Sequence, residues 1–203
     1  MGICYIVSAG DMAQTFPKAE KDDIIIAADA GYLHLEALGM EPDILLGDFD
    51  SMSIPEDKQA LVYPVRKDDT DTMLAIKTGF EKGFSEFVIY GALGGERTDH
   101  SIANIQSLGY IAEHGGRGTL VGRNEIFTII RDGETVITSA ENKTFSVFAY
   151  GGIAEGVTIE GSHYDIENAQ LSPFFPLGVS NKFKNPSVKI KVENGCLLIA
   201  YSV

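Results

Sequence analysis

Residues 42–51 read Pro-Asp-Ile-Leu-Leu-Gly-Asp-Phe-Asp-Ser, a short apolar run that ends in a glycine and two aspartates. The run is continuously apolar rather than alternating, which is typical of a strand buried on both faces of a parallel sheet. Segments of helical spacing separate several such runs, and this alternation predicts a mostly parallel α/β domain of Rossmann-like layers. The predicted strands are 3–8, 24–28, 44–47, 61–65 and 87–90, and the predicted helices are 32–38, 70–82 and 98–114.

The pattern changes near Arg123, where short strands and turn dipeptides replace the helices. Such a pattern predicts an all-β domain, a sandwich or a jelly-roll-like fold, and we place the boundary between residues 1–122 and 123–203. Residues 171–186 contain three prolines and predict a long loop. The predicted strands of this half are 125–131, 135–138, 144–150, 157–159, 188–192 and 197–201, with turns at Asp132-Gly133, Gly151-Gly152 and Asn194-Gly195.

Composition restricts the class of protein. The chain has 203 residues, 44% of them hydrophobic, and a formal net charge of -13, which is concentrated in the first half. Residues 1–122 carry 20 Asp and Glu against 9 Lys and Arg, so we expect no binding to nucleic acid or to anionic membranes. Two cysteines without a metal-binding spacing, and no apolar run long enough for a membrane span, predict a soluble cytoplasmic protein.

Asp48 and Asp50 are the first candidate metal ligands. Residues two apart in an extended segment project to the same side, so both carboxylates can reach one cation while Phe49 turns toward the core. Magnesium suits such ligands, because it takes one or two protein carboxylates and fills its shell with waters and substrate phosphates. The alternative is that both aspartates are turn or cap residues after the strand.

A second acidic segment, Lys67-Asp68-Asp69-Thr70-Asp71, stands at the start of a predicted helix. Asp69 or Thr70 can cap this helix, which explains part of the acidity. Asp71 in the first turn can bind metal or orient a nucleophile, and Lys67 can meet a phosphate oxygen.

Residues 91–100, Gly-Ala-Leu-Gly-Gly-Glu-Arg-Thr-Asp-His, join a buried strand to a helix, as in sites that hold anions on backbone amides. Arg97 can bind phosphate oxygens with two hydrogen bonds, and His100 can contact nucleotide. Asp99 can hold Arg97, cap the helix or touch the ligand. The alternative is a plain strand-to-helix turn. The chain contains neither GxxxxGK[ST] nor GxGxxG, so a P-loop and a classical dinucleotide-binding fold are not supported. Together the residues indicate a magnesium-dependent site that transfers or hydrolyses phosphate.

The order of these motifs resembles that of thiamine pyrophosphokinases. The resemblance rests on Ala-Asp-Ala-Gly at 28–31, Gly-Asp-Phe-Asp-Ser at 47–51, Lys-Asp-Asp-Thr-Asp at 67–71 and Arg-Thr-Asp-His at 97–100 with Ala-Asn at 103–104. It continues into Gly-Val-Ser-Asn-Lys-Phe at 178–183, which is similar to the segment that binds thiamine in that family.

The resemblance implies transfer of the pyrophosphoryl group of ATP to the hydroxyl of thiamine, with AMP as the other product. It implies a catalytic domain for nucleotide and metal at 1–122 and a thiamine-binding and dimerisation domain at 123–203. Asp43 and Asp69 are then structural. The implied roles are Mg²⁺ on Asp48, Asp50 and Asp71, catalysis by these and Arg97, nucleotide on Asp29, Lys67, Asp68, Thr70, Asp99, His100 and Asn104, and thiamine on Ser180 and Asn181.

The resemblance also implies a homodimer with active sites at the interface. Two other functions remain open. The aspartates alone would suit a metal-dependent nucleotide phosphohydrolase, and a silent thiamine or nucleotide sensor would keep the same pocket. Ser180 and Asn181 separate the first alternative from a kinase, because hydrolysis has no use for them.

Overall fold

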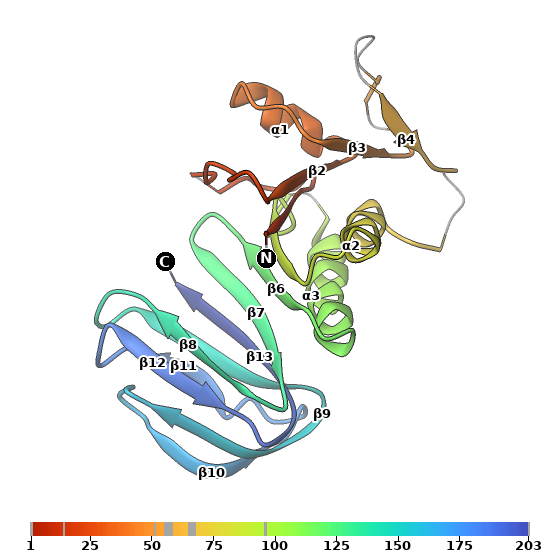
Figure 1. Cartoon of the computed structure of the whole chain (residues 1–203). Helices are drawn as coiled ribbons and strands as arrows, with labels where there is room; N and C mark the ends of the chain where they lie inside the picture. Colours follow the sequence, from red (N-terminus) through yellow and green to blue (C-terminus); the bar gives the residue numbers. More distant parts are fainter. Residues whose placement is uncertain are drawn as a thin grey trace. The chain divides into compact units, whose positions relative to one another are not determined.

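The computed structural model describes residues 2–13, 15–50, 52–54, 59–64, 68–95 and 97–202. The chain divides into two compact units, Met1–Arg123 and Asn124–Val203 (Figure 1). The boundary that the sequence predicts near Gly122 lies beside this division.

Unit 1 is an α/β domain built on a parallel sheet. Its described strands run in the spatial order β4-β3-β2-β1-β5-β6, and every neighbouring pair is parallel. The parallel α/β architecture that the sequence predicts for this half is therefore confirmed. The strands are β1 (Cys4–Val7), β2 (Ile24–Ala28), β3 (Ile44–Gly47), β4 (Ala60–Val62), β5 (Glu86–Tyr90) and β6 (Arg117–Val121), and the helices are α1 (Gly31–Ala37), α2 (Asp71–Glu81) and α3 (Thr98–Glu113).

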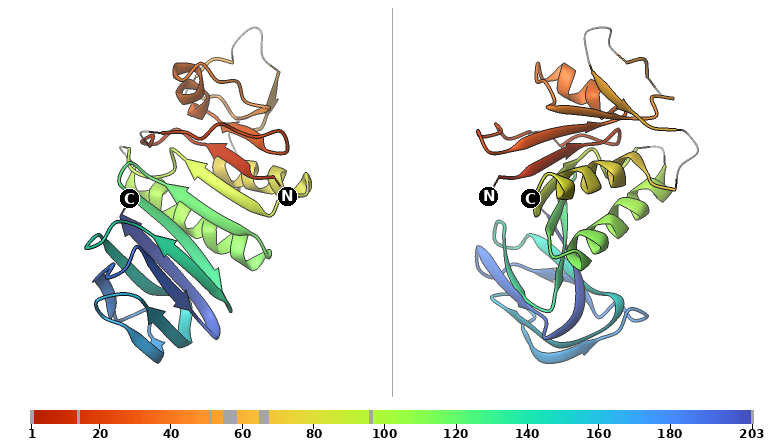
Figure 2. Two further views of the ribbon diagram at one scale, coloured as in Figure 1. Left: turned by 60° about the vertical axis from the view of Figure 1, so that its left-hand side comes forward. Right: turned by 45° about the vertical axis from the view of Figure 1, so that its right-hand side comes forward.

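Helices cover both faces of this sheet (Figure 2). On one face, Tyr5, Ile25 and Leu45 from three adjacent strands form a core with Tyr32 and Leu35 of α1. The intervening residues of the strands point to the other face, as the pleat requires. There α2 packs so closely that a Cβ added at Gly79 would lie 2.5 Å from Phe87 and 2.9 Å from the Sγ atom of Cys4. The strands are continuously apolar because both of their faces are buried.

The strand order reverses at β1. The chain runs outward from β1 through β2 and β3 to β4, then returns to place β5 on the other side of β1. In an open α/β sheet such a reversal leaves a crevice at the carboxyl ends of the two strands, where ligands bind. The segments after β1 and β5 are therefore the structural origin of the site.

Unit 2 is all β within the described residues. Its strand pairs are all antiparallel, in the order β7-β13-β9-β12-β8, and β10 and β11 also pair with β9. One hydrophobic core contains residues from both halves of β9, among them Phe145, Val147, Val157 and Ile159. The strands are β7 (Glu125–Arg131), β8 (Glu134–Thr138), β9 (Thr144–Glu160), β10 (Ile166–Leu171), β11 (Gly178–Lys182), β12 (Ser187–Lys191) and β13 (Asn194–Ser202). The finer assignment to a sandwich or jelly roll stays a prediction.

Four details of unit 2 differ from the sequence-based prediction, and the first is that the predicted turn Asn194-Gly195 forms the start of β13. Residues 144–150 and 157–159 belong to one strand, β9, rather than two (Figure 1). Gly151 and Gly156 have φ of 71° and 65°, so they interrupt the register locally without ending the strand. The predicted loop 171–186 contains β11, which pairs with β9. β10 was not predicted, because its sequence, Ile-Glu-Asn-Ala-Gln-Leu, does not alternate regularly.

No helix in the described part of the chain is long and apolar enough to cross a membrane.

Candidate functional site

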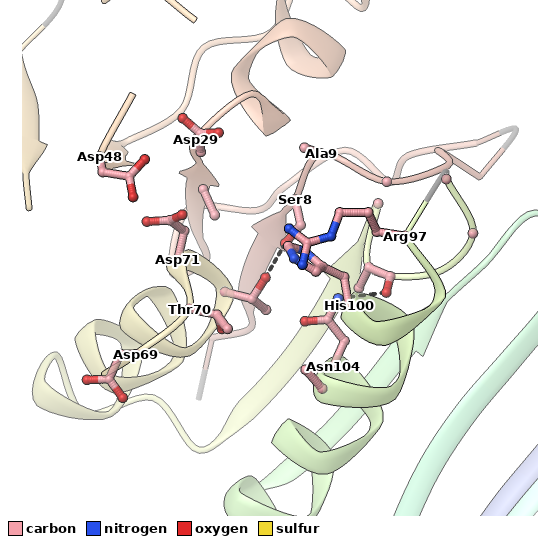
Figure 3. A pocket seen from close by; sticks show the side chains of 18 of the residues that line it. Ser8, Ala9, Asp29, Asp48, Asp69, Thr70, Asp71, Arg97, His100 and Asn104 are labelled. Atoms are coloured by element: carbon pink, nitrogen blue, oxygen red, sulfur yellow. Dashed lines mark hydrogen bonds between the residues drawn. The ribbon is translucent and has the colours of Figure 1, made fainter. Parts of the chain in front are cut away.

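A cavity of ≈ 530 Å³ lies in unit 1 where β1 and β5 end (Figure 3). Five separate segments supply its walls, which are the ends of β1, β2 and β3, the start of α2, and the β5–α3 connection with the first turns of α3. The residues that line it are Ser8, Ala9, Gly10, Ala28, Asp29, Asp48, Asp50, Asp69, Thr70, Asp71, Thr72, Gly91, Ala92, Gly94, Gly95, Arg97, His100, Ala103 and Asn104.

The loops after β1 and β5 cross at very short range. The amide of Ser8 donates to the carbonyl of Tyr90 at 2.9 Å, and the amide of Gly10 donates to that of Gly91 at 2.6 Å. Gly91 has φ of 62°, and a Cβ there would lie 2.0 Å from the carbonyl oxygen of Ser8. Only glycine satisfies both conditions. The crossing forms the floor of the cavity.

The predicted carboxylates gather on one side of the cavity. Asp29 follows β2, Asp48 and Asp50 follow β3, and Asp71 opens α2, and Figure 3 shows Asp48 and Asp71 pointing toward each other. Phe49 packs against the core between the two aspartates, as predicted, with φ of 55°. The amide of Asp50 also donates to Asp48 Oδ1 at 3.3 Å, so the turn that the alternative reading expected is present as well.

The carboxylates do not form a complete metal cage. In the part of the chain that the structure describes, no three His, Cys, Asp or Glu side chains are close enough to make one. The oxygen-only donor set nevertheless fits Mg²⁺, which needs only one or two protein carboxylates when waters and phosphates complete its shell.

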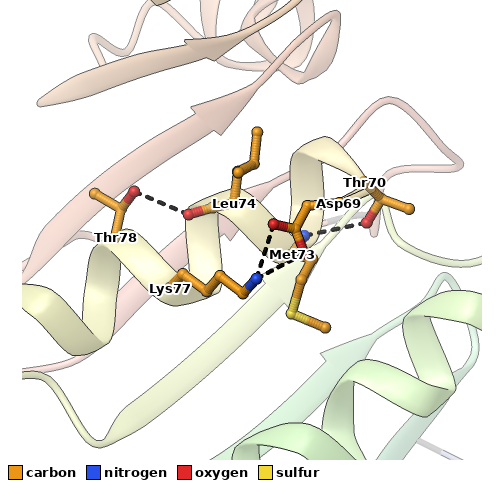
Figure 4. A network of polar contacts seen from close by, with 6 residues as sticks. All are labelled: Asp69, Thr70, Met73, Leu74, Lys77 and Thr78. Atoms are coloured by element: carbon orange, nitrogen blue, oxygen red, sulfur yellow. Dashed lines mark hydrogen bonds and ion pairs between the residues drawn. The ribbon is translucent and has the colours of Figure 1, made fainter. Parts of the chain in front are cut away.

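At the start of α2, two polar residues already have structural partners (Figure 4). Thr70 is the N-cap residue, and its Oγ1 accepts from the amide of Met73 at 3.2 Å. Asp69 lines the cavity, but Lys77 Nζ donates to its two oxygens at 2.7 and 2.8 Å. The hydrogen bond to Asp69 raises the pKa of Lys77. Lys77 of α2 thus holds Asp69, which precedes the helix, in agreement with a structural role.

Arg97 and His100 lie across the cavity from the carboxylates (Figure 3). Arg97 Nη2 donates to Asp99 Oδ2 at 2.6 Å, and its Nε donates to Oδ1 at 3.3 Å. This hydrogen bonding lowers the pKa of Asp99 and raises the pKa of Arg97. Of the three roles open to Asp99, the geometry matches that of holding Arg97. Asn104 donates to the carbonyl of Ala92 at 2.7 Å and so fixes the loop after β5.

Several predicted site residues lie elsewhere. Asp68 and Asp99 do not line the cavity, and Lys67 lies outside the described residues. Ser180 and Asn181 belong to β11 of unit 2. Neither residue is among those that line the cavity.

Asn181 is engaged on all sides within unit 2. It is 7% exposed, its Nδ2 donates to Ser162 Oγ and to the carbonyl of Tyr164, and its Oδ1 accepts from the amides of Tyr164 and Lys182. Ser180 is exposed, has φ of 61°, and donates its amide to Ser146 Oγ at 3.1 Å. Asn181 thus fixes the backbone beside Ser180, which is exposed.

Sequence reasoning missed two contacts at the cavity wall. Ser8 Oγ and Thr72 Oγ1 are 2.8 Å apart, and His34, which the sequence offered no reason to single out, places Nε2 2.9 Å from the carbonyl oxygen of Gly10. No motif could have found these pairs, because their members lie 64 and 24 residues apart.

Two family models together match most of the chain. Residues 17–117 match the thiamin pyrophosphokinase catalytic domain, and residues 130–197 match the thiamin pyrophosphokinase vitamin B1 binding domain. The chain belongs to the thiamine pyrophosphokinase family. The recognition made from the motifs is confirmed, and the catalytic-domain model covers every cavity residue except those that follow β1.

Relatives of known name agree with this family. Thiamine pyrophosphokinase of Bacillus subtilis (strain 168) is 29% identical over 185 residues, which are 87% of this chain and 86% of that protein. Among solved structures, the thiamine pyrophosphokinase of Bacillus subtilis has a TM-score of 0.85 at 24% identity, covering 99% of both chains. That of Geobacillus thermodenitrificans has a TM-score of 0.84 at 24% identity, covering 99% of this chain and 97% of that one. These structural matches establish a common fold.

Proposed function

We propose that this protein transfers the pyrophosphoryl group of ATP to the hydroxyl of thiamine and releases AMP. The observation that carries the proposal is the cavity at the β1/β5 reversal, which unites Asp48, Asp50, Asp71 and Arg97 inside the region that matches the catalytic-domain model. The match of unit 2 to a vitamin B1 binding domain supports thiamine as the acceptor.

The finer proposal is a magnesium site on Asp48, Asp50 and Asp71. Bound Mg²⁺ would neutralise charge on the phosphate oxygens of ATP and help to align them. In a domain with 20 acidic and 9 basic residues over 1–122, a bare polyphosphate would otherwise be repelled. The concentration of carboxylates on one side of the cavity supports this proposal.

The reaction requires an in-line displacement at the β-phosphorus. The thiamine hydroxyl oxygen forms a bond to that phosphorus, and the bond from the phosphorus to the α–β bridging oxygen breaks, so that AMP leaves with the electron pair. We assign to Asp71, which lines the cavity, the role of orienting the hydroxyl and accepting its proton. A loose transition state needs little removal of the proton at an early stage, so a carboxylate is a sufficient base.

The remaining cavity residues would position the nucleotide. Arg97, which Asp99 holds, supplies positive charge toward phosphate oxygens, while Asp29, His100 and Asn104 supply polar contacts around it. Ser180 is the proposed thiamine contact of unit 2, and Asn181 supports it through the backbone. We propose further that the active molecule is a homodimer with its sites at the interface.

The direct test is to incubate the protein with ATP, Mg²⁺ and thiamine and to identify the adenine product by chromatography. We expect AMP that forms only when thiamine is present, together with thiamine diphosphate. We also expect a chelator to abolish the reaction and added Mg²⁺ to restore it. Formation of ADP, or of AMP without thiamine, would identify a nucleotide phosphohydrolase instead. Binding of both substrates without turnover would identify a sensor.

A further inference from the structure

Ser8 and Thr72 form a buried pair of hydroxyl groups in the cavity wall. Ser8 is 6% exposed and Thr72 is 7% exposed, and both line the cavity. Ser8 follows β1, whereas Thr72 lies in the first turn of α2 directly after Asp71. Their oxygens are 2.8 Å apart, so one hydroxyl donates to the other.

The pair has one more hydrogen than it can use internally. Two hydroxyls carry two hydrogens and four lone pairs, and the bond between them consumes one hydrogen. Among the described residues, neither hydroxyl makes another hydrogen bond. A buried O–H group without an acceptor costs free energy, and the cavity that both residues line is where an acceptor can enter.

The charges around the pair indicate which acceptor fits. Figure 3 places Ser8 between the carboxylates of Asp48 and Asp71 on one side and Arg97 and His100 on the other. A polyphosphate that extends from a metal ion on the carboxylates to Arg97 would share the cavity that Ser8 and Thr72 line. Its non-bridging oxygens are strong acceptors, and hydrogen bonds to charged groups are stronger than those to neutral ones.

We propose that the Ser8–Thr72 pair donates a hydrogen bond to a non-bridging oxygen of the nucleotide's polyphosphate. The inference rests on the proposed function only in placing a polyphosphate in this cavity. Either hydroxyl can be the outward donor, and the other orients it. The pair therefore recognises the phosphate chain and has no part in binding the nucleoside.

The test is calorimetric binding of Mg²⁺-ATP, of inorganic tripolyphosphate with Mg²⁺, and of adenosine, each without thiamine. A Ser8→Ala/Thr72→Val double variant removes both hydroxyls at little change in volume. We expect it to bind ATP and tripolyphosphate about tenfold more weakly, as for loss of one hydrogen bond to a charged group, and adenosine as the wild type does. Each single variant should lose less, because the remaining hydroxyl still donates without its orienting partner.

Thr78 offers a matched control. It is buried in the same helix, does not line the cavity, and donates its hydroxyl to the carbonyl of Leu74 at 2.8 Å (Figure 4). Thr78→Val should leave binding of all three ligands unchanged. The inference is overturned if the double variant binds ATP as tightly as Thr78→Val, or if it loses adenosine affinity to the same extent.

Single variants keep the inference testable if the double variant does not fold. Thr72→Val should then bind ATP and tripolyphosphate about threefold more weakly, and Thr72→Ser should bind both as tightly as the wild type. Equal affinities of the wild type and both variants would contradict the proposed role of the pair. A wild type that binds ATP but forms no AMP with thiamine refutes the proposed function alone. A wild type that forms AMP, beside a double variant with normal ATP affinity, refutes this inference alone.

Discussion

The aspartates of unit 1 differ in the groups that already hold them. Asp43 Oδ2 accepts from the amide of Ile25 at 2.8 Å, and Asp69 is paired with Lys77, so both carboxylates stabilise the fold. Asp48 and Asp71 line the cavity, and their carboxylates point toward each other in Figure 3. A carboxylate that is saturated by protein donors is a poor metal ligand, because binding a cation would first require breaking those bonds.

Replacement of Asp71 by Asn keeps the shape of the side chain and removes its charge. We expect turnover of ATP and thiamine to fall at least about a hundredfold, the scale of a lost charged transition-state contact. Asp69→Asn is the matched control, because Asp69 lines the same cavity from two residues away but is held by Lys77. Steady-state AMP formation measures both. Near-normal turnover in Asp71→Asn would remove Asp71 from the catalytic residues.

The residues that line the cavity could be predicted from the sequence better than their hydrogen-bond partners. Asp29, Asp48, Asp71 and Arg97 could be found because strand ends and helix starts of a parallel sheet meet at one edge. The choice of Thr70 as the cap required the structure, since Asp69 was equally suitable by type. The ordinary contacts of serine and threonine side chains carry no sequence pattern at all.

At the level of elements, helices were easier to predict than the strands of unit 2. The predicted helix 70–82 became α2, Asp71–Glu81, because a cap and an apolar stripe both marked it. β9 was divided in the prediction, since Gly151-Gly152 has the composition of a turn. Burial continues on both sides of the glycines, at Ala149 and Ala154, which single-residue propensities do not reveal.

Asp23 ties the start of β2 to β1 and should make stability depend on pH. Its Oδ1 accepts from the amide of Ile3 and its Oδ2 from that of Glu20, both at 2.8 Å. These hydrogen bonds, the one from Ile3 first, lower the pKa of Asp23 in the folded state. The stabilisation is therefore complete above the unfolded pKa of about 3.9 and disappears as the pH falls through the lower folded value.

Denaturation of the wild type and of Asp23→Asn across this range provides the measurement. The wild type should be more stable at neutral pH, and its advantage should shrink below about pH 4. Asp22→Asn, at the exposed neighbouring position, is the control and should follow the wild type. A constant difference between wild type and Asp23→Asn at every pH would show that the carboxylate charge is not responsible.

For the whole molecule, an apolar loop of unit 2 is the clearest candidate for self-association. Phe174 is 95% exposed, Phe175 is 66% exposed, and Leu177 lies beside them, an unusual concentration for a surface in contact with water. A Phe174→Ser/Phe175→Ser variant should therefore shift the proposed homodimer toward monomer in analytical ultracentrifugation. Its thermal stability at low protein concentration should be unchanged.

Val136→Ser is the matched control for this experiment. Val136 is also an exposed apolar residue of unit 2, in β8, away from the loop in sequence. Its replacement should leave the sedimentation of the protein unchanged. A monomeric wild type, or a loop variant that remains dimeric, would place the interface elsewhere or exclude it.

The reversal of strand order at β1 also determines when the cavity can exist during synthesis. Its first contributor, Ser8, is translated early, but Arg97 and Asn104 come almost a hundred residues later. A nascent chain that ends at β4 already holds many of the carboxylates and still lacks the second wall. Since a ligand of the assembled cavity binds only the folded unit, it stabilises completed chains and gives no help to partial ones. Ligand binding at the cavity would thus add to the stability of the completed unit 1 alone.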